Sequence, residues 1–365
     1  MAQLTPEDVL QALAAVQEPD LGRDLVSAGL VRDVEIGPGN AVTARIVLLS
    51  PASAFKDAIG QAADAAISSL PGVGPVQLTL APETPNAPHK LKQIRHILGV
   101  GAGKGGVGKS TVAVNLAMAL QHAGGRVGLL DADVYGPSVP IMLGLRGTRP
   151  TVNAQRKIIP AQAHGIKCIS MGFLVQEDMA VAWRGPMVGR AVQQFIDDVE
   201  WGELDYLVVD LPPGTGDVIL SLCQAIPLSG AVVVTTPQDV AFADVLRAVR
   251  MFSMLKVEVV GLVENMSWFR CPDNDKRYEI FGPSRSAANG AAHSLELMGQ
   301  FPIDLAVSPN ADAGLPIAVA QPDGEQARLY RELGAKVVSK LTLLGWQARE
   351  KASVGRGFFS TRPPA

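Results

Sequence analysis

The sequence Gly103-Lys104-Gly105-Gly106-Val107-Gly108-Lys109-Ser110-Thr111 decides the fold of this chain. It fits the pattern G-x-x-x-x-G-K-[ST] and lies between an apolar run, residues 97–100, and a helical pattern that starts near Val112. In this strand–loop–helix context the pattern predicts a phosphate-binding loop, because its glycines let backbone N–H groups turn toward an anion at a helix N-terminus. The alternative is a glycine-rich turn that binds nothing, and the complete motif disfavours it.

The residues of this loop have expected roles in binding ATP and Mg²⁺. All nine, Gly103, Lys104, Gly105, Gly106, Val107, Gly108, Lys109, Ser110 and Thr111, are expected to contact the nucleotide. Lys109 is expected to reach the β- and γ-phosphates, and the Ser110 hydroxyl to ligate Mg²⁺. Lys104 is not required by an ordinary phosphate loop, so it is either a solvated side chain or a second functional lysine.

Two carboxylates follow the next apolar strand, residues 127–131. Ligands of such a sheet bind outside the carboxyl ends of its strands, so Asp131 and Asp133 are candidates for the nucleotide site. Asp131 is a candidate for holding a Mg²⁺-bound water, and Asp133 for orienting the water that attacks the γ-phosphate. The alternative is that both are exposed loop residues or helix caps.

Three further strand ends contribute candidate residues. Leu207-Val208-Val209-Asp210 is an apolar strand that delivers one carboxylate, Asp210, to the metal, and the glycine-containing segment 211–217 after it resembles a switch loop. Asn265 ends another strand and could hydrogen-bond the adenine edge, and Pro237 lies in a similar position after its own strand. These last two signals are weak individually, because Asn and Pro commonly terminate strands.

The pattern along the 365 residues divides the chain into four parts. The pattern predicts a small α+β domain at residues 1–80 and a Pro-rich linker at 81–93. It predicts an α/β domain with a mostly parallel sheet covered by helices at 94–345, and a flexible basic tail at 346–365. In the first domain we expect helices at 6–16 and 51–70 and strands at 31–36, 42–48 and 76–80. In the second we expect strands at 97–100, 127–131, 206–210, 231–235 and 257–263 and a last helix at 324–344.

Composition limits the classes of function. Lys and Arg number 32 against 35 Asp and Glu, a net charge of −3, so no basic field favours nucleic acid. The apolar runs are strand-sized, the first residues lack the pattern of a signal peptide, and three scattered cysteines make no disulfide framework. We therefore expect a cytoplasmic protein without a membrane or nucleic-acid partner.

Five segments together resemble the Mrp/ApbC-type iron–sulfur cluster carriers, deviant-Walker relatives of MinD and ParA within the P-loop NTPases. The segments are GKGGVGKST from Gly103, DADVYGPS from Asp131, VDLPPGTGD from Val209, TTPQD from Thr235 and ENMSWF from Glu264. The resemblance covers residues 94–345, and residues 1–80 resemble the small iron–sulfur-assembly domain that often precedes them. It implies a homodimeric ATPase in which Lys104 reaches the partner subunit's nucleotide as a charge clamp.

The resemblance also implies a [4Fe–4S] cluster that bridges two subunits and passes to apoproteins, with an assembly scaffold as a further partner. The family usually holds the cluster with Cys-x-x-Cys, whereas here Cys271 is followed by Asn274 in the second position. Ser53 likewise stands where relatives of the front domain often have a cysteine. Cys271 is thus one ligand of an incomplete site, a surface residue of a turn, or part of another redox or metal contact. Cys168 and Cys223 lie in apolar patterns and are expected in the core.

Three other functions compete with a cluster carrier. A nucleotide-gated assembly chaperone without its own cluster fits the missing cysteine. A MinD/ParA-like positioning ATPase would need a membrane helix or a basic face, and the last helix has an ordinary apolar side and a thin basic tail. A reductase like the nitrogenase iron protein would need well-separated cysteines in both switch regions, which the sequence lacks.

Overall fold

The computed structural model describes residues 4–82, 91, 93–173 and 185–357. Its contacts divide the chain into two compact units. One unit combines Met1–Thr84 with Val338–Ala365, and the other is Pro85–Val337. The boundary at residue 84 falls within the segment that the sequence predicts to be a linker.

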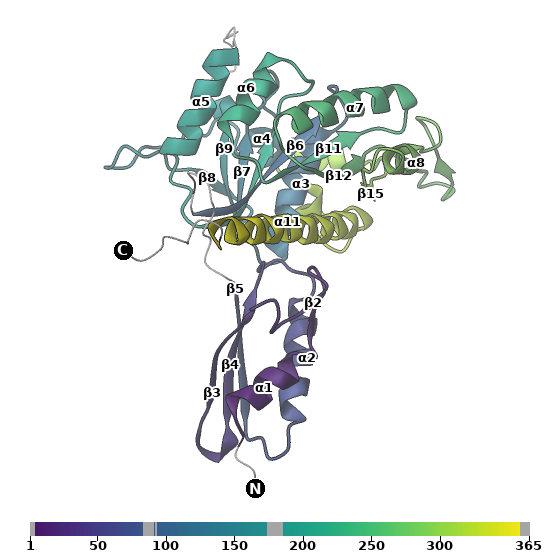
Figure 1. The fold of residues 1–365 in the computed structure, drawn as a ribbon. Helices are drawn as coiled ribbons and strands as arrows, with labels where there is room; N and C mark the ends of the chain where they lie inside the picture. Colours follow the sequence, from purple (N-terminus) through teal and green to yellow (C-terminus); the bar gives the residue numbers. More distant parts are fainter. Residues whose placement is uncertain (1–3, 83–90, 92, 174–184, 358–365) are drawn as a thin grey trace. The chain divides into compact units, whose positions relative to one another are not determined.

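The front unit is a three-stranded sheet with two helices packed on it (Figure 1). Strand β3 (Val31–Ile36) pairs antiparallel with β4 (Val42–Leu48), and β4 pairs parallel with β5 (Val76–Pro82). The helices are α1 (Pro6–Leu13) and α2 (Lys56–Ser68), and the short strands β1 (Gln17–Glu18) and β2 (Arg23–Asp24) form a separate pair. Helix α1 begins at a capping box, in which Thr5 accepts from the Asp8 N–H and the Asp8 carboxylate accepts from the Thr5 N–H.

The large unit contains an eight-stranded sheet in the order β15-β12-β11-β6-β10-β7-β9-β8. All neighbouring strands are parallel except β8, which is antiparallel to β9. The strands are β6 (Ile94–Ala102), β7 (Val127–Asp131), β8 (Ala161–Ala163), β9 (Ile166–Ser170), β10 (Leu204–Asp210), β11 (Gly230–Thr235), β12 (Val259–Glu264) and β15 (Leu297–Gln300). Central strands β6, β7, β10 and β11 are buried along their whole length, as expected for a sheet covered on both faces.

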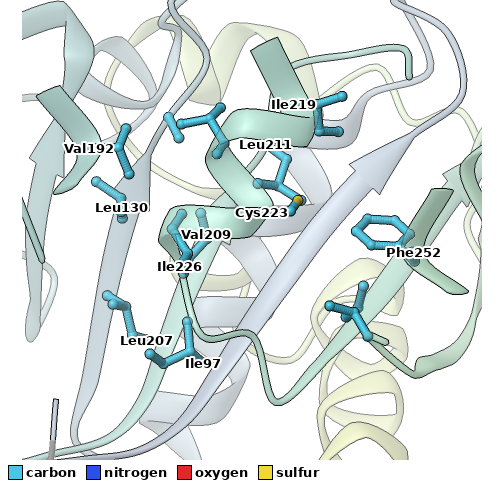
Figure 2. Packing of buried hydrophobic residues seen from close by; sticks show 14 of the residues in the cluster. Ile97, Leu130, Val192, Leu207, Val209, Leu211, Ile219, Cys223, Ile226 and Phe252 are labelled. Carbon is cyan, nitrogen blue, oxygen red and sulfur yellow. The ribbon is translucent and has the colours of Figure 1, made fainter. Parts of the chain in front are cut away.

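Helices cover both faces of this sheet (Figure 1). Helices α5 (Gly185–Asp198), α6 (Asp217–Ala225) and α7 (Asp239–Met254) lie on one face, and α3 (Lys109–His122) lies on the other with the first part of α11 (Glu325–Gly357). Figure 2 shows part of the first face, where Ile219 and Cys223 of α6, Phe252 of α7 and the β10 residues Leu207 and Val209 belong to one buried cluster. The Phe252 ring lies over β6 at Gly101. The shorter elements are α4 (Val139–Met142), α8 (Ser286–Ala291), α9 (Val307–Asp312), α10 (Ile317–Ala320), β13 (Phe269–Arg270) and β14 (Arg277–Tyr278).

The structure differs from the expected elements in three ways. The sequence pattern missed β8, β9 and β15, which are short strands at or near the edges of the sheet. Helices α1 and α2 are shorter than expected, ending at Leu13 and beginning at Lys56. The prediction of a flexible tail from residue 346 is wrong as far as Gly357, because α11 continues to that residue; Ala348 to Ala352 are good helix formers without a proline. Residues 358–365 lie outside the described residues.

Candidate nucleotide-binding site

The phosphate-binding loop connects β6 to α3 at the carboxyl edge of the sheet, between the neighbouring strands β10 and β11. Two of its glycines are required by geometry. A Cβ on Gly103 would collide with the backbone of Asp244 in α7, and Gly108 has φ +79°, where L residues are strained. Helix α3 begins directly after Gly108, and the first N–H groups of a helix have no partner within the helix, so they can bind an anion.

Lys109 points its ammonium into a group of carboxylates. Its Nζ lies 2.5 Å from Asp210 Oδ1 and 3.4 Å from Asp133 Oδ2, and it donates to the Ser110 hydroxyl at 3.3 Å. The Lys109 side chain is 6% exposed and that of Asp210 is completely buried. The strand ends of β7 and β10 thus meet the first turn of α3, as the sequence predicts for a metal–phosphate site.

Asp131 lies behind this group and is completely buried. Its Oδ1 accepts from the Asp133 N–H at 3.1 Å, and its Oδ2 accepts from the Ser170 hydroxyl at 2.8 Å. Burial, together with the charge of neighbouring Asp210, raises the pKa of Asp131 well above its usual range. Burial also raises the pKa of Asp210, although the charge of Lys109 opposes that shift. Ser170 is a site residue that the sequence pattern did not indicate.

A cavity of about 200 Å³ opens beside Lys109. Seven loop and helix residues that the sequence predicts to bind nucleotide line it, namely Lys104, Gly105, Gly106, Gly108, Lys109, Ser110 and Thr111. Asp133, just after the end of β7, lines it too. Ser138, Met142 and Pro213 complete the lining. Within the loop, the Val107 side chain is buried, and Lys104 is half-buried and lines the cavity. The cavity is therefore bounded by the groups that a triphosphate requires.

The residues around Lys109 fit a bound Mg²⁺. Asp210 Oδ2 is buried and has no hydrogen-bond partner among the described residues. Two carboxylates, Asp133 and Asp210, lie beside the single ammonium of Lys109, and a divalent cation would offset that excess of negative charge. Carboxylate and hydroxyl oxygens are the ligands that Mg²⁺ prefers. Ser110 and Asp210 are the residues that would hold it, where it would neutralise charge on the β- and γ-phosphates.

The two candidates for adenine contacts occupy different surroundings. Asn265 follows β12, and its Nδ2 donates to the Val107 carbonyl at 2.9 Å, so its side chain ties the phosphate loop to the end of β12, two strands from β6 in the sheet. Pro237 is buried after β11. Neither residue lines the cavity beside Lys109. Their contact with a base stays a prediction.

Glu264, the last residue of β12, is a buried carboxylate held by neutral donors. Its Oε1 accepts from Gln300 Nε2 at 2.9 Å and its Oε2 from the Ser284 hydroxyl at 2.7 Å. Gln300 Nε2 also donates to Ser284 Oγ at 3.0 Å. The carboxylate thus joins the end of β12 to the end of β15 and to the chain that returns from residues 268–283.

Cys271 lies in that returning segment, at the turn of the β13–β14 hairpin. Its N–H donates to the Lys276 carbonyl and its carbonyl accepts from the Asp275 N–H, both at 2.9 Å. The Asn274 side chain accepts from the Lys276 N–H at 3.0 Å, which stabilises the turn. Around Cys271, the described residues include no group of three or more His, Cys, Asp or Glu side chains that could hold a metal ion. Cluster ligation within one chain therefore has no preformed site around Cys271 in those residues.

The other sulfur positions are buried. Cys168 in β9 and Cys223 in α6 both belong to the core, as predicted. Burial raises the pKa of the Cys168 thiol well above its usual value and that of Cys223 to about 12, so both stay protonated at neutral pH. Ser53 in the front unit is also buried, and its hydroxyl accepts from the Phe55 N–H at 3.2 Å. The burial of these three side chains fits a role in packing the protein interior.

The sequence matches two family models and several characterised relatives. Residues 93–338 match the model of the NUBPL iron-transfer P-loop NTPase, and residues 6–95 match that of an iron–sulfur cluster assembly protein. The iron–sulfur cluster carrier protein of Deinococcus radiodurans is 46% identical over 336 residues, which cover 92% of this chain and 95% of the relative. The carrier protein of Synechocystis sp. is 42% identical over 349 residues, covering 93% and 99%.

A solved structure shares the fold of the large unit. The nucleotide-binding protein of Archaeoglobus fulgidus, determined in complex with ADP, superimposes with a TM-score of 0.58 and 35% identity. The match covers 66% of this chain and 94% of that protein. Among the described residues, no helix is both long and apolar enough to cross a membrane.

Proposed function

Because the chain belongs to the family of NUBPL-type iron-transfer P-loop NTPases, we propose that it hydrolyses ATP and carries an iron–sulfur cluster to apoproteins. The observation that carries the ATPase part is the grouping of Lys109, Asp210 and Asp133 beside a cavity lined by the phosphate loop. The cluster part is supported by relatives named as carriers that match over nearly the whole chain.

Hydrolysis would be divided among the residues at the carboxyl edge. Lys109 would neutralise the β- and γ-phosphates, and Ser110 and Asp210 would hold Mg²⁺. Asp133 presents its carboxylate 3.4 Å from Lys109 Nζ and would orient the attacking water. Asp131 would hold Asp133 in place by accepting a hydrogen bond from the Asp133 backbone N–H.

We propose that two copies of the chain act together and that bound nucleotide sets the geometry of the pair. Lys104 is half-buried and lines the cavity, and it would complete the partner subunit's nucleotide site as a charge clamp. The segment 211–217 after Asp210 would respond to the γ-phosphate. The protein would then be a slow ATPase without a membrane or nucleic-acid partner.

In such a pair, Cys271 from each chain would supply two thiolates to a bridging [4Fe–4S] cargo. The remaining ligands would come from oxygen donors or from thiols of the assembly scaffold and of the client apoprotein. A cluster held in this way would be labile, which suits a protein that passes its cargo on.

A second candidate function is supported by the surroundings of Cys271. In the described residues Cys271 has no cluster of metal-ligating neighbours, and Asn274 hydrogen-bonds within the turn. This favours an assembly chaperone that uses ATP to gate a client protein without holding a cluster itself.

Anaerobic reconstitution with iron and sulfide separates the two candidates. A carrier gains iron, sulfide and a visible absorption band, loses them in Cys271→Ala, and restores activity to an apo iron–sulfur enzyme. A chaperone gains no cluster in either protein while its ATPase activity stays intact. Absence of ATP hydrolysis by the full chain with Mg²⁺ would contradict both candidates.

A further inference from the structure

Ser170 ends β9 beside the nucleotide site, although it is distant in sequence from every motif of that site. In the parallel pairing of β7 with β9, Ser170 is the partner of Asp131, and Asp131 is in turn the partner of Asp210 on β10. Three neighbouring strands therefore end in a row of polar residues, Ser170, Asp131 and Asp210. All three side chains are completely buried.

The Ser170 hydroxyl uses both of its hydrogen-bonding functions. It donates to Asp131 Oδ2 at 2.8 Å and accepts from the Gly172 N–H at 2.9 Å. Gly172 itself packs against Pro137, since a Cβ there would lie 3.1 Å from the Pro137 side chain. The hydroxyl oxygen is thus held by the backbone that follows it, and moving it away from Asp131 would leave the half-buried Gly172 N–H without this partner.

Asp131 transmits this restraint to Asp133. With Oδ2 held by Ser170, its Oδ1 accepts from the Asp133 N–H at 3.1 Å. Asp133 Oδ1 then accepts from the N–H groups of Tyr135 and Gly136, at 3.2 and 3.3 Å. This arrangement leaves Asp133 Oδ2 beside Lys109 and the cavity.

We propose that Ser170 is a positioning residue for ATP hydrolysis, acting through Asp131 on the carboxylate of Asp133. This inference rests on the proposed ATPase function. Ser170 holds the Asp131 carboxylate in one orientation, and that orientation fixes the Asp133 backbone. Asp131 in this arrangement supports the water-orienting residue and has both oxygens engaged by protein donors.

The test is steady-state hydrolysis and ATP binding by the full chain carrying Ser170→Ala. A positioning role lowers kcat about tenfold, the effect of losing one hydrogen bond to a charged group, while the Kd for ATP changes by less than about twofold. Ser170→Thr keeps the hydroxyl and restores kcat to within about threefold of wild type. If Ser170→Ala fails to fold, the near-isosteric Ser170→Cys carries the same expected loss, because a thiol is a weak donor.

Two comparisons separate positioning from general destabilisation. Ser229→Ala removes a hydroxyl that accepts from the Ile97 N–H at 3.0 Å, in the same sheet but away from the site, and keeps kcat. In an Asp131→Asn background, Ser170→Ala lowers kcat by less than about twofold further, because the residue through which it acts is already altered.

Equal kcat in wild type and Ser170→Ala would overturn the inference while leaving the ATPase function in place. A full tenfold loss that persists in the Asp131→Asn background would overturn it too, because Ser170 would then act independently of Asp131. Absence of hydrolysis by the wild-type chain would overturn the proposed function, and this inference with it.

Discussion

Lys109 is surrounded by more negative charge than it can neutralise. Its ammonium contacts Asp210 directly and lies near Asp133. It also interacts electrostatically with Asp131, which is buried behind these two carboxylates. Isolated buried charges are costly, so the Lys109 ammonium stabilises this group of carboxylates. The two lysines of the loop therefore have different surroundings. Lys109 is buried among carboxylates, whereas Lys104 is half-buried, lines the cavity and is not part of this ion-pair group.

Lys109→Ala should impair both ATP binding and hydrolysis, whereas Lys104→Ala should reduce hydrolysis and spare much of the binding. Removing Lys109 also leaves buried carboxylates without their cation, which should cost roughly 3 kcal/mol of folding stability. Isothermal titration with ATP, steady-state hydrolysis and thermal melts would measure the three effects. Binding must be measured below the melting temperature of the variant.

Lys157→Ala is a suitable control, because Lys157 is 43% exposed in the same unit and pairs with Asp198. It should leave binding and hydrolysis unchanged. Equal losses of binding and hydrolysis in Lys104→Ala and Lys109→Ala would contradict the separate roles of the two lysines.

At the scale of elements, sequence pattern predicted the central strands well and the edge strands poorly. Strand β7 has the predicted bounds, because a fully apolar run that ends in Asp131 is an unambiguous signal. Strand β8, Ala161-Gln162-Ala163, has three residues and no such run, and it forms only because β9 offers it an antiparallel partner. Short edge strands of this kind depend on tertiary pairing.

In the candidate site, too, the residues of local sequence motifs were predictable and those that depend on strand pairing were not. The loop from Gly103 to Thr111 and the carboxylates Asp133 and Asp210 are local motifs, and the structure brings them together. Ser170 was not predictable, because a serine after Ile169 is unremarkable until β9 pairs with β7. The tie between Asn265 and Val107 similarly depends on how two distant strand ends meet.

Strand β1 of the front unit contains a carboxylate that opposes folding at neutral pH. Glu18 is buried, and burial raises its pKa above the usual value. A carboxyl group with a raised folded pKa binds more protons in the folded state, so stability is present below the unfolded pKa and is lost as pH rises through the folded pKa. Glu18→Gln should therefore raise the melting temperature at pH 7.

The gain from Glu18→Gln should shrink as pH falls below about 4.5, where glutamate itself is protonated in both states. The substitution keeps Oε1, which accepts from the Asp20 N–H at 3.0 Å, so the backbone contact is retained. Thermal melts from pH 4 to 8 would measure it, with Glu7→Gln on the exposed side of α1 as the control. A lower melting temperature at pH 7 would show that the charge of Glu18 stabilises the front unit.

At the scale of the whole molecule, the nucleotide site and the β13–β14 hairpin that contains Cys271 lie in the same unit, but they follow different strands of its sheet. The loop that binds phosphate follows β6, whereas the hairpin with Cys271 lies between β12 and β15. The two backbone hydrogen bonds of Cys271, with Lys276 and Asp275, are made without the Asn274 side chain, which accepts separately from the Lys276 N–H. Position 274 can therefore accept a thiol without loss of the hairpin.

Asn274→Cys should create a Cys-x-x-Cys pair and increase cluster retention. Two thiolates per chain would give four across a dimer, the number that a [4Fe–4S] cluster takes. We expect more iron bound after anaerobic reconstitution and slower loss to a chelator than in the wild type. Asp275→Cys is the matched control, since it adds a thiol one residue further along, and it should retain less iron than Asn274→Cys. Equal iron contents in Asn274→Cys and wild type would argue that this turn is not where the cargo binds.

The buried carboxylate of Glu264 has a consequence for how this family can vary. It binds Ser284 where the chain returns from the hairpin and Gln300 at the end of β15, so the root of the hairpin is fixed independently of its tip. The Trp268 carbonyl also accepts from the Ile303 N–H and Phe269 bridges to Ile303, so we expect the exchangeable part of the hairpin to lie between Phe269 and Ser284. A relative's hairpin with another cysteine spacing, joined at Phe269 and Ser284, would keep the same attachment, so the cysteine spacing of this hairpin can vary while the sheet and the phosphate loop stay unchanged.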